Sequence, residues 1–431
     1  MDKLVIEGGV PLRGEVDVSG AKNAVLPILA ATILADGPCT LEGVPDLRDI
    51  DTMLRILREL GLDAERGPGG TVVTEVRDPT QCRAPYELVK TMRASICVLG
   101  PLLGRRHRAE VSFPGGCVIG PRPIDLHMAG LEALGAELRL EGGYILADGH
   151  RMSGREVYLG GAYGPTVTGT ANVLMAAVLT PGTTVIEYAA CEPEVTDLAR
   201  FLCAMGARIE GIGSPHLVVT GVDRLRGTRW RVIADRIEAG TFMTAAAITH
   251  GDVTIRGADL AQMTAVVAAL RRMGVEVDRC PEGVRVRSLD RIHPTDIVTM
   301  PYPGFPTDLQ AQFMATLCIA DGNSFVTEKI YPERFIHVAE LQRMRARIRK
   351  EGPTAIVEGV DFLSGAPVMA SDLRASAALV VAGLAAHGTT TVDRVYHIDR
   401  GYERIEEKLE GLGARIRRVS DRVAVPADAE A

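Results

Sequence analysis

Aromatic residues are scarce in this chain. They make up 4% of its 431 residues, and Trp230 is the single tryptophan. Proteins that bind single-stranded nucleic acid stack bases on aromatic side chains, and proteins that coat DNA or RNA carry a large positive charge. The formal net charge here is −7. The composition therefore predicts no nucleic-acid partner, although a local basic pocket for a small anion fits within an acidic whole.

Long apolar runs and paired cysteines are also missing. Glycine or proline interrupts every apolar stretch before it reaches membrane-spanning length, and the N-terminal sequence lacks the pattern of a secretory signal. None of the eight cysteines forms a CxxC pair or a zinc-like cluster with histidine. We expect no membrane insertion, no metal, a reducing cytoplasmic location, and burial of Cys97 and Cys318 as small apolar residues.

Three common catalytic fingerprints do not occur. The chain has no G-x-x-x-x-G-K-[ST] loop, no dinucleotide-binding glycine motif on a strand-helix-strand unit, and no G-x-S-x-G. Chemistry that depends on ATP or NAD has no direct support. We expect no cofactor.

What the chain does contain is a sixfold internal repeat. A helix end, usually a glycine, and a short alternating strand recur at Gly61, Gly135, Gly206, Gly274, Arg345 and Gly413, with spacings of 68 to 74 residues. Such regular spacing indicates a repeated structural unit. Glycine at this place is typical of a left-handed helix cap. At Arg345 we expect a positive φ that costs about 1 kcal/mol.

A second marker precedes each of these positions. An apolar helix ends in glycine and a strand follows, at Gly37, Gly104, Gly182, Gly251, Gly322 and Gly388. Each unit is predicted to run strand, helix, strand, helix, strand. Six such α/β modules predict two domains of three, the first over residues 21–233 and the second over 234–431. The N-terminal strand within 3–18 lacks a complete module of its own, so we assign 1–20 to the second domain.

Polar residues stand near the start of the first helix in most modules. They are Lys22, Arg93, Thr168, Arg236, Asp308 and Arg374. Cations at a helix N-terminus are disfavoured by about 0.3–1 kcal/mol each. A shared phosphate-like anion would explain several of them, because helix N-termini and cations hold phosphate together. Solvated first-turn cations are the alternative.

Residues 113–127 carry the most informative segment. Cys117 stands among glycines and prolines, so we place it on a loop, and Arg122 follows it closely. A thiol beside a guanidinium can have a lowered pKa, and the thiolate is the reactive form. A mobile loop with one thiol and one anion-binding arginine suggests a lid over a phosphorylated or carboxylated substrate.

Three further residues are open to two interpretations. Asp308 is well placed to cap a helix, yet a carboxylate there could also act as a base. Arg400 and Arg334 each stand near a predicted helix start, where arginine is usually structural but can bind an anion.

Several longer motifs together point to one family. They are Val18 to Ala24 (VSGAKNA), Lys90 to Ser95 (KTMRAS), Pro114 to Cys117 (PGGC), Phe305 to Asp308 (FPTD) with Gln310 to Gln312 (QAQ), Asp372 to Ser376 (DLRAS), and His397 to Glu403 (HIDRGYE). Over nearly its whole length the chain resembles the UDP-N-acetylglucosamine 1-carboxyvinyltransferase family of enolpyruvyl transferases. That resemblance implies an inside-out α/β barrel with two domains of three modules each.

The resemblance also implies a reaction and a set of roles. Phosphoenolpyruvate would react with UDP-N-acetylglucosamine to give the 3-O-enolpyruvyl ether and phosphate, by addition and then elimination, as the first committed step toward peptidoglycan. Cys117 would be the acid, the site of a covalent phosphoenolpyruvate adduct and the target of fosfomycin. Asp308 would be the base. The implied phosphoenolpyruvate contacts are Lys22, Arg122 and Arg400, and the implied substrate-binding positions also include Asn23, Arg93, Pro123, Ile124, Asp125, Leu126, Asp308, Ile330, Arg334 and Arg374.

Two alternatives stay open on the sequence. Gly160 to Tyr163, Ala171, Cys191 and Arg345 depart from the family pattern, which leaves room for a paralogous enolpyruvyl transferase with another acceptor. A shikimate 3-phosphate enzyme would share the fold but lack the loop of Cys117. A non-catalytic homologue that binds the sugar nucleotide and a partner protein is the other alternative. No obligate protein partner is expected.

Overall fold

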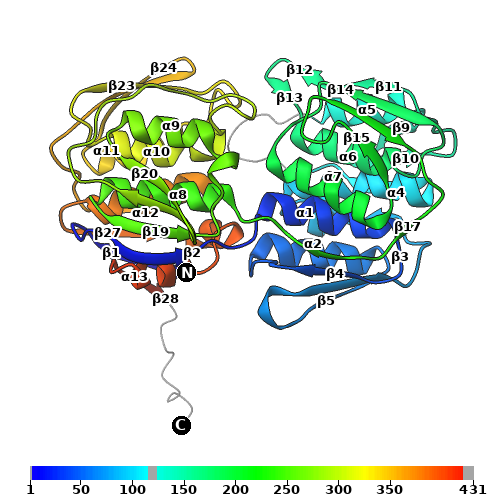
Figure 1. The fold of residues 1–431 in the computed structure, drawn as a ribbon, viewed down its shortest axis with the longest axis horizontal. Helices are drawn as coiled ribbons and strands as arrows, with labels where there is room; N and C mark the ends of the chain where they lie inside the picture. Colours follow the sequence, from blue (N-terminus) through cyan, green and yellow to red (C-terminus); the bar gives the residue numbers. More distant parts are fainter. Residues whose placement is uncertain (1, 115–123, 421–431) are drawn as a thin grey trace, which may run out of the picture.

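The computed structural model describes residues 2–114 and 124–420, which fold into two lobes that lie side by side (Figure 1). Each lobe has its own apolar core. The core of lobe 1 is built from residues between Ala21 and Val232, and the core of lobe 2 from residues between Leu4 and Val16 and between Ile237 and Ile416. None of the helices in the described part of the chain is long and apolar enough to cross a membrane.

Lobe 1 contains three four-stranded sheets of one pattern, in which a parallel pair is extended by antiparallel strands. The first orders β18 (Arg229–Arg231), β4 (Cys39–Glu42), β6 (Val72–Val76) and β5 (Leu62–Arg66). The second orders β7 (Arg83–Ala84), β8 (Arg108–Ser112), β10 (Tyr144–Asp148) and β9 (Glu137–Glu141). The third orders β11 (Glu156–Tyr158), β14 (Thr183–Glu187), β16 (His216–Thr220) and β15 (Arg208–Glu210). Two-strand pairs join β17 (Leu225–Arg226) to β3 (Ala35–Asp36), and β12 (Gly160–Gly161) to β13 (Gly164–Pro165).

Lobe 2 also contains three four-stranded sheets, and each has the same pattern of one parallel and two antiparallel pairings. One orders β2 (Arg13–Asp17), β19 (Asp252–Arg256), β21 (Gly283–Arg287) and β20 (Glu276–Cys280). Another orders β22 (Ile297–Val298), β23 (Asn323–Thr327), β25 (Thr354–Glu358) and β24 (Arg347–Glu351). The last orders β26 (Pro367–Met369), β27 (Thr389–Asp393), β1 (Asp2–Glu7) and β28 (Arg415–Ser420). The N-terminal strands β1 and β2 therefore complete two sheets of lobe 2.

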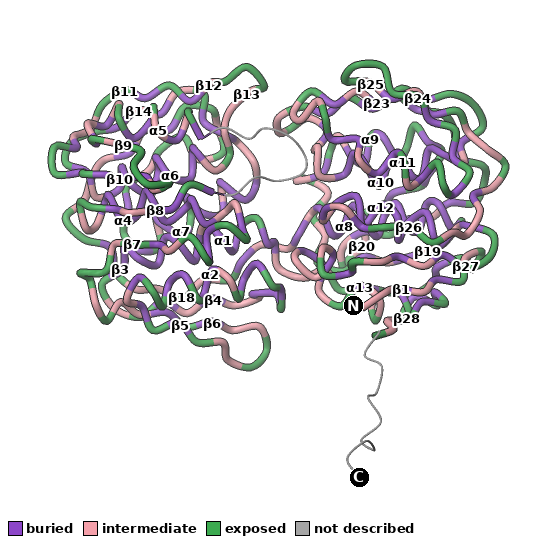
Figure 2. The backbone as a smooth tube through the Cα atoms, turned by 180° about the vertical axis from the view of Figure 1, so that it is seen from behind, coloured by how far each residue is buried: buried purple, intermediate pink, exposed green. Residues whose placement is uncertain are grey.

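The helices form two layers. The inner helices, buried along most of their length, are α1 (Lys22–Ala31), α4 (Leu99–Arg106) and α6 (Val167–Ala177) in lobe 1, and α8 (Arg236–Ile248), α10 (Gln310–Leu317) and α12 (Leu373–Ala385) in lobe 2. The outer helices are α2 (Arg48–Glu59), α5 (Asp125–Ala133), α7 (Pro193–Met205), α9 (Thr264–Arg272), α11 (His337–Arg343) and α13 (Ile405–Gly411). Apolar helices lie inside and sheets outside in both lobes, and Figure 2 shows the burial concentrated along the inner helices. This is the predicted inside-out arrangement of six modules.

Short helical segments complete the modules. They are η1 (Thr32–Leu34), η2 (Pro68–Gly70), α3 (Tyr86–Val89), η3 (Arg93–Val98), η4 (Leu260–Gln262), η5 (Thr307–Leu309) and η6 (Val395–Arg400). Three of them, η3, η5 and η6, directly precede a longer helix or end near one, and they carry Arg93, Asp308 and Arg400.

The left-handed position predicted at Arg345 is confirmed. Its φ is 77°, while the equivalent positions of the other five modules are glycines with positive φ. The Arg345 guanidinium lies 4.0 Å from the centre of the Phe362 ring, a cation–π contact that offsets part of the backbone strain. The second marker was only partly correct. The helix α4 runs past Gly104 to Arg106 and ends at His107, whose φ is 54°, so glycine does not end the helix in that module.

Two chain segments cross between the lobes and pair with each other. Gly20 and Ala234 form an antiparallel bridge, and the amide of Asp235 donates to the carbonyl oxygen of Ser19 at 2.8 Å. The Glu238 carboxylate of α8 accepts the Ser19 amide at 2.6 Å. The two crossings are therefore held as one connected strip.

Glu238, the buried carboxylate at this crossing, is paired with a lysine. Lys408 of α13 donates to Glu238 at 2.7 Å and to the Ser19 hydroxyl at 2.7 Å. Glu403 accepts from that hydroxyl and from the Asp46 amide of lobe 1. Burial raises the pKa of Glu238 to about 7 against the opposing effect of Lys408.

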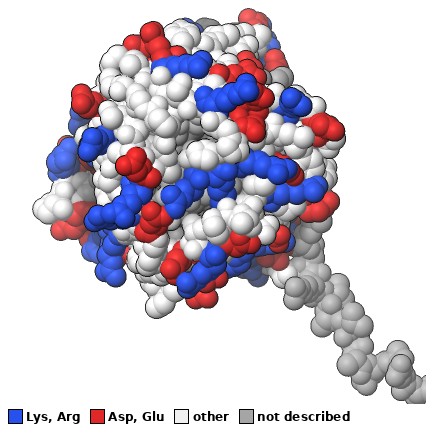
Figure 3. All heavy atoms as spheres, turned by 90° about the vertical axis from the view of Figure 1, so that its right-hand side faces the viewer, with Lys and Arg blue, Asp and Glu red and all other residues white. Residues whose placement is uncertain are grey.

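On the outer face of lobe 1, basic side chains lie beside acidic ones (Figure 3). Among the atoms coloured in that view, charges of both signs are interspersed.

The inner helices approach each other so closely that a methyl group would not fit at Gly100. A Cβ there would lie 2.1 Å from the backbone oxygen of Asn172 on α6. We predict that Gly100→Ala lowers the free energy of unfolding by about 1–3 kcal/mol, because backbone must move to relieve the overlap. Urea denaturation of the purified variant measures the change.

Gly411 of α13 provides the matched control. It is also helical, and a Cβ there meets nothing within 4 Å. Gly411→Ala should raise stability by about 0.5–1 kcal/mol, since alanine is the better helix former. Equal effects of the two substitutions would contradict the packing described for α4 and α6.

Candidate active site

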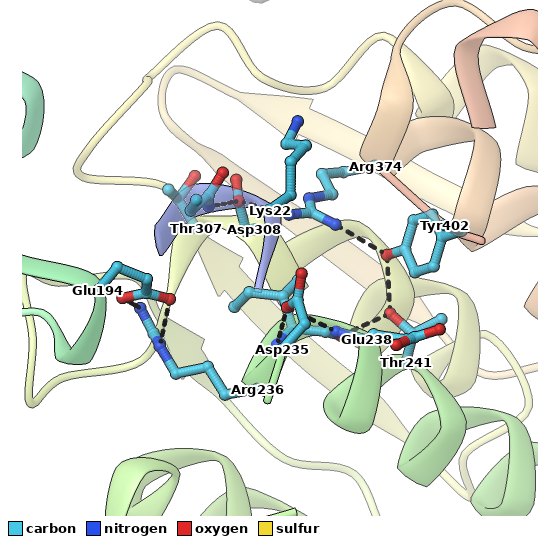
Figure 4. Close-up of polar contacts among 12 residues, drawn as sticks. Lys22, Glu194, Asp235, Arg236, Glu238, Thr241, Thr307, Asp308, Arg374 and Tyr402 are labelled. Atoms are coloured by element: carbon cyan, nitrogen blue, oxygen red, sulfur yellow. Dashed lines mark hydrogen bonds and ion pairs between the residues drawn. The ribbon is translucent and has the colours of Figure 1, made fainter. Parts of the chain in front are cut away.

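The Asp308 carboxylate lies between two buried arginines. Arg334 donates to one of its oxygens at 2.9 Å. Arg374, at the start of α12, donates to the other at 2.9 Å, and Figure 4 shows Arg374 and Asp308 near each other. Arg374 is 2% exposed and Arg334 is 7% exposed. The Asp308 side chain makes no capping bond to η5, so the capping interpretation of Asp308 was wrong.

This pairing fixes the charge of Asp308. Burial alone would raise its pKa, but Arg374 and Arg334 outweigh that effect and hold the pKa of Asp308 well below its usual range. Asp308 is therefore an ionised hydrogen-bond acceptor at any ordinary pH.

A buried hydroxyl network holds Arg374 in place. Its guanidinium donates to the Tyr402 hydroxyl at 3.1 Å, and that hydroxyl contacts the Thr241 hydroxyl at 2.9 Å (Figure 4). Gln312 of α10 donates to the Tyr402 hydroxyl at 3.2 Å and to the Asp308 carbonyl oxygen at 3.0 Å. Three inner helices of lobe 2 thus contribute to one arginine's orientation.

Arg334 is held through a second buried carboxylate, Glu328. Arg334 donates to the Thr307 hydroxyl at 3.0 Å, and Thr307 donates to Glu328 at 2.9 Å. Glu328 also accepts the backbone amides of Ile330 and Tyr331, each at 2.9 Å. Through Glu328, Thr307 and Arg334, these hydrogen bonds connect the half-buried Ile330 to Asp308.

A second carboxylate, Asp49, joins the two lobes. It lies in the first turn of α2 and is 4% exposed. One oxygen is 3.2 Å from the Lys22 ammonium of α1, and the other accepts from Nε of Arg400 in lobe 2 at 2.9 Å. The amide of Asn23, next to Lys22, donates to Asp308 across the lobes at 3.4 Å. Lys22, Asn23, Asp308, Arg334, Arg374 and Arg400 therefore belong to one region between the lobes.

The first-turn cations prove to have partners within the chain. Lys22 pairs with Asp49, Arg374 with Asp308, and Arg236 with Glu194 of α7 at 2.9 Å (Figure 4). The sequence interpretation offered a shared bound anion, with solvation of the cations by water as the alternative. Carboxylates of this chain supply much of the compensating charge, and neither Asp49 nor Glu194 was recognised from the sequence.

The other predicted site residues lie along lobe 1. Arg93 begins η3 and is half-buried; Ile124 is buried just before α5; and Asp125 and Leu126 open that helix, exposed and half-buried respectively. Cys117, Arg122 and Pro123 lie outside the described residues.

The hairpin of β12 and β13 belongs to lobe 1 and reaches toward lobe 2. A Cβ at Gly161 would come within 2.9 Å of Leu126, and one at Gly164 within 2.5 Å of Pro301 in lobe 2. The segment Gly160 to Tyr163, which departs from the expected family pattern, therefore lies against the predicted position Leu126.

Two cysteines behave as predicted. Cys97 and Cys318 are fully buried, and burial raises the pKa of each thiol to about 12. They are unreactive packing residues. Within residues 2–114 and 124–420, no three His, Cys, Asp or Glu side chains gather as they would around a metal ion.

Comparison with known proteins decides the family. The family model described as EPSP synthase (3-phosphoshikimate 1-carboxyvinyltransferase) matches residues 6–409. The chain belongs to the EPSP synthase family of enolpyruvyl transferases. Within this family, a UDP-N-acetylglucosamine 1-carboxyvinyltransferase of Anaeromyxobacter dehalogenans is 57% identical over 97% of this chain and 100% of the relative. One from Nitratidesulfovibrio vulgaris is 54% identical over 98% and 100%.

Solved structures of enolpyruvyl transferases share the architecture. The enolpyruvyl transferase NikO of Streptomyces tendae aligns with a TM-score of 0.87 and 26% identity, over 97% of this chain and 98% of that one. An EPSP synthase of Acinetobacter baumannii aligns with a TM-score of 0.75 and 18% identity, over 97% and 100%, which shows the fold alone. The inside-out α/β fold predicted from the sequence is confirmed.

Asp308 neutralises the guanidiniums of two buried arginines, Arg334 and Arg374. We predict that Asp308→Asn lowers the free energy of unfolding by about 3 kcal/mol or more, because removing one partner of a buried ion pair leaves uncompensated charge. Thermal and urea unfolding measure the loss.

Asp252 supplies the control, since it forms a two-point ion pair with Arg285 on the surface. Asp252→Asn should change stability little, because water solvates both exposed partners. If Asp308→Asn were equally mild, the arginines would have another compensating partner.

Proposed function

We propose that this chain transfers the enolpyruvyl group of phosphoenolpyruvate to the 3-hydroxyl of UDP-N-acetylglucosamine and releases phosphate. The observation that carries the proposal is the 54–57% identity, over nearly the full chain, to enzymes named for this reaction. The cation-rich region between the lobes supports it, because both substrates are anionic. In a cell the product would feed peptidoglycan precursor synthesis.

The reaction consists of an addition and an elimination. In the addition, a proton goes to the methylene carbon of phosphoenolpyruvate and the sugar 3-oxygen bonds to the neighbouring carbon, as the hydroxyl gives up its proton. In the elimination, the new methyl group loses a proton, the bond from carbon to the phosphate oxygen breaks, and phosphate leaves. The enzyme must supply an acid, a base and fixed positive charge for the carboxylate and phosphate.

Lys22, Arg400 and Arg122 are the proposed phosphoenolpyruvate contacts. Lys22 and Arg400 come from different lobes and already share the Asp49 carboxylate, which supports a common anion site. Fixed cations stabilise developing phosphate charge with little reorganisation. Arg374 and Arg334 are proposed to act mainly through Asp308.

Asp308 is the proposed base for the sugar hydroxyl. Its ionised state and the two arginines that orient it support an acceptor role. A carboxylate with such a low pKa is a weak base in the ground state. We infer that it takes the proton only as the carbon–oxygen bond forms, when the hydroxyl becomes strongly acidic.

Cys117 is the proposed acid for the methylene carbon and the site of a covalent adduct with phosphoenolpyruvate. The sugar nucleotide is proposed to contact Asn23, Arg93, Pro123, Ile124, Asp125, Leu126, Asp308 and Ile330. We also propose that residues 21–233 form one domain and that residues 1–20 with 234–431 form the other. The separate cores of the two lobes support that division.

Phosphate release distinguishes the acceptors. We predict turnover with phosphoenolpyruvate and UDP-N-acetylglucosamine, and at least 100-fold lower kcat/KM with shikimate 3-phosphate, because a site built to hold one acceptor's polar groups rejects another strongly. Colorimetric phosphate detection measures both rates. A preference for another nucleotide sugar would favour the paralogous enzyme, and binding without turnover would favour the non-catalytic homologue.

Intact mass tests the assignment of Cys117. After incubation with phosphoenolpyruvate or with fosfomycin, the unmodified chain should gain the mass of one adduct, because a thiolate adds to either electrophilic carbon. Cys117→Ala should gain none and should lose phosphate release. The control is Cys203→Ala, which removes a half-buried thiol on α7 and should retain the adduct. An adduct that persists in Cys117→Ala would place the reactive thiol elsewhere.

A further inference from the structure

Asp49 makes a contact between the lobes and has no role in the reaction as proposed above. Its carboxylate is buried, yet both oxygens are engaged by cations that are proposed to bind phosphoenolpyruvate. Lys22 lies at 3.2 Å and the Nε atom of Arg400 at 2.9 Å, with a longer contact of 3.5 Å to a terminal guanidinium nitrogen.

The three groups come from three separate elements. Lys22 begins α1, Asp49 lies in the first turn of α2, and Arg400 ends η6 in lobe 2. Two cations that face each other across an interface repel unless an anion lies between them. Asp49 is that anion, and it lies on the helix α2 rather than on a loop.

We propose that Asp49 is a positioning residue for the enolpyruvyl transfer. By binding one cation from each lobe, it holds the Lys22 ammonium and the Arg400 guanidinium in the relative placement that phosphoenolpyruvate requires. This inference rests on the function proposed above. Pre-placed cations lower the reorganisation needed when the substrate arrives, so the expected effect falls on phosphoenolpyruvate and not on the sugar nucleotide.

Asp49 also influences the protonation of Lys22. Charged groups of four other elements act on Lys22: Asp49 of α2, Arg374 of α12, Arg400 of η6 and Asp308 of η5. Burial lowers the pKa of Lys22, and the two arginines lower it further, while Asp49 is the strongest opposing influence. Without the Asp49 charge, Lys22 would lose its proton at a lower pH.

The test compares Asp49→Asn with the parent protein in steady-state phosphate release. We expect kcat/KM for phosphoenolpyruvate to fall about 10- to 100-fold, with KM for UDP-N-acetylglucosamine within about twofold, because such a loss reflects a misplaced pair of cations. The alkaline limb of the pH profile of kcat/KM for phosphoenolpyruvate should move to lower pH, since this profile reports the free enzyme. A merely structural residue would not move that limb.

Asp51→Asn is the matched control. Asp51 lies one half-turn further along α2, its side chain is 57% exposed, and it pairs with Arg66 on the surface. Its substitution should leave both kinetic constants and the pH profile unchanged. Circular dichroism and thermal unfolding confirm that each variant is folded.

Asp49→Glu separates charge from position and serves if Asp49→Asn does not fold. It retains the negative charge but displaces the carboxylate by one methylene. It should keep the alkaline limb where the parent has it and still lose kcat/KM for phosphoenolpyruvate. Unchanged or improved kcat/KM in both variants would overturn the proposal, because Asp49 would then be only a competitor of the substrate anion.

If the proposed function is wrong, the experiments give a different result. A parent protein that releases no phosphate from the two substrates would refute the function itself. In that case calorimetric binding of phosphoenolpyruvate still tests Asp49: affinity reduced in Asp49→Asn and not in Asp51→Asn supports positioning, and equal affinities refute it. An active parent with an equally active Asp49→Asn refutes the positioning role alone.

Discussion

Positive charge buried between two lobes is the condition on which the rest of this structure depends. A guanidinium or ammonium removed from water needs a counter-charge at hydrogen-bonding distance, and the chain provides one shared carboxylate for each pair of cations. Asp308 serves Arg334 and Arg374, and Asp49 serves Lys22 and Arg400. Two further carboxylates, Asp372 and Asp235, also act on Arg334 and Arg374 respectively, so the arginines of lobe 2 are compensated from more than one side.

The repeated modules explain how such a region can be built. The inner helices α1, α8, α10 and α12 begin near the space between the lobes, and the polar residue at each of these starts lies there with it. The inner helices pack on one another so closely that glycine is required at points such as Gly100, which keeps their ends in fixed relation. Rigid helices thus position the charged groups, and the crossing strip at Ser19 and Asp235 keeps the lobes in register.

Local pattern predicted the modules well, because helix periodicity and helix-ending glycines are properties of short segments. It also predicted the positive φ of Arg345, because glycines occupy the equivalent position in the other five modules and glycine there is typical of a left-handed helix cap. The partners of the cations could not be found in this way. Asp49 lies 27 residues from Lys22 and 351 from Arg400, and an aspartate in a helix's first turn is ordinarily explained by the helix dipole. Tyr402 and Gln312 were missed for the same reason. The Tyr402 hydroxyl meets Arg374, and the Gln312 amide meets that hydroxyl, only after three modules have packed together.

The network around Arg374 also constrains the chemistry assigned to Asp308. Tyr402 and Thr241 hold the guanidinium from the far side, so Arg374 is not free to move away when a proton reaches the carboxylate. A protonated Asp308 would therefore lie beside two fixed positive charges, which makes that state short-lived. On the proposed mechanism, the proton taken from the sugar hydroxyl must leave Asp308 before or together with phosphate. On this mechanism, the two arginines that make Asp308 a weak base also favour the transfer of its proton to the leaving phosphate.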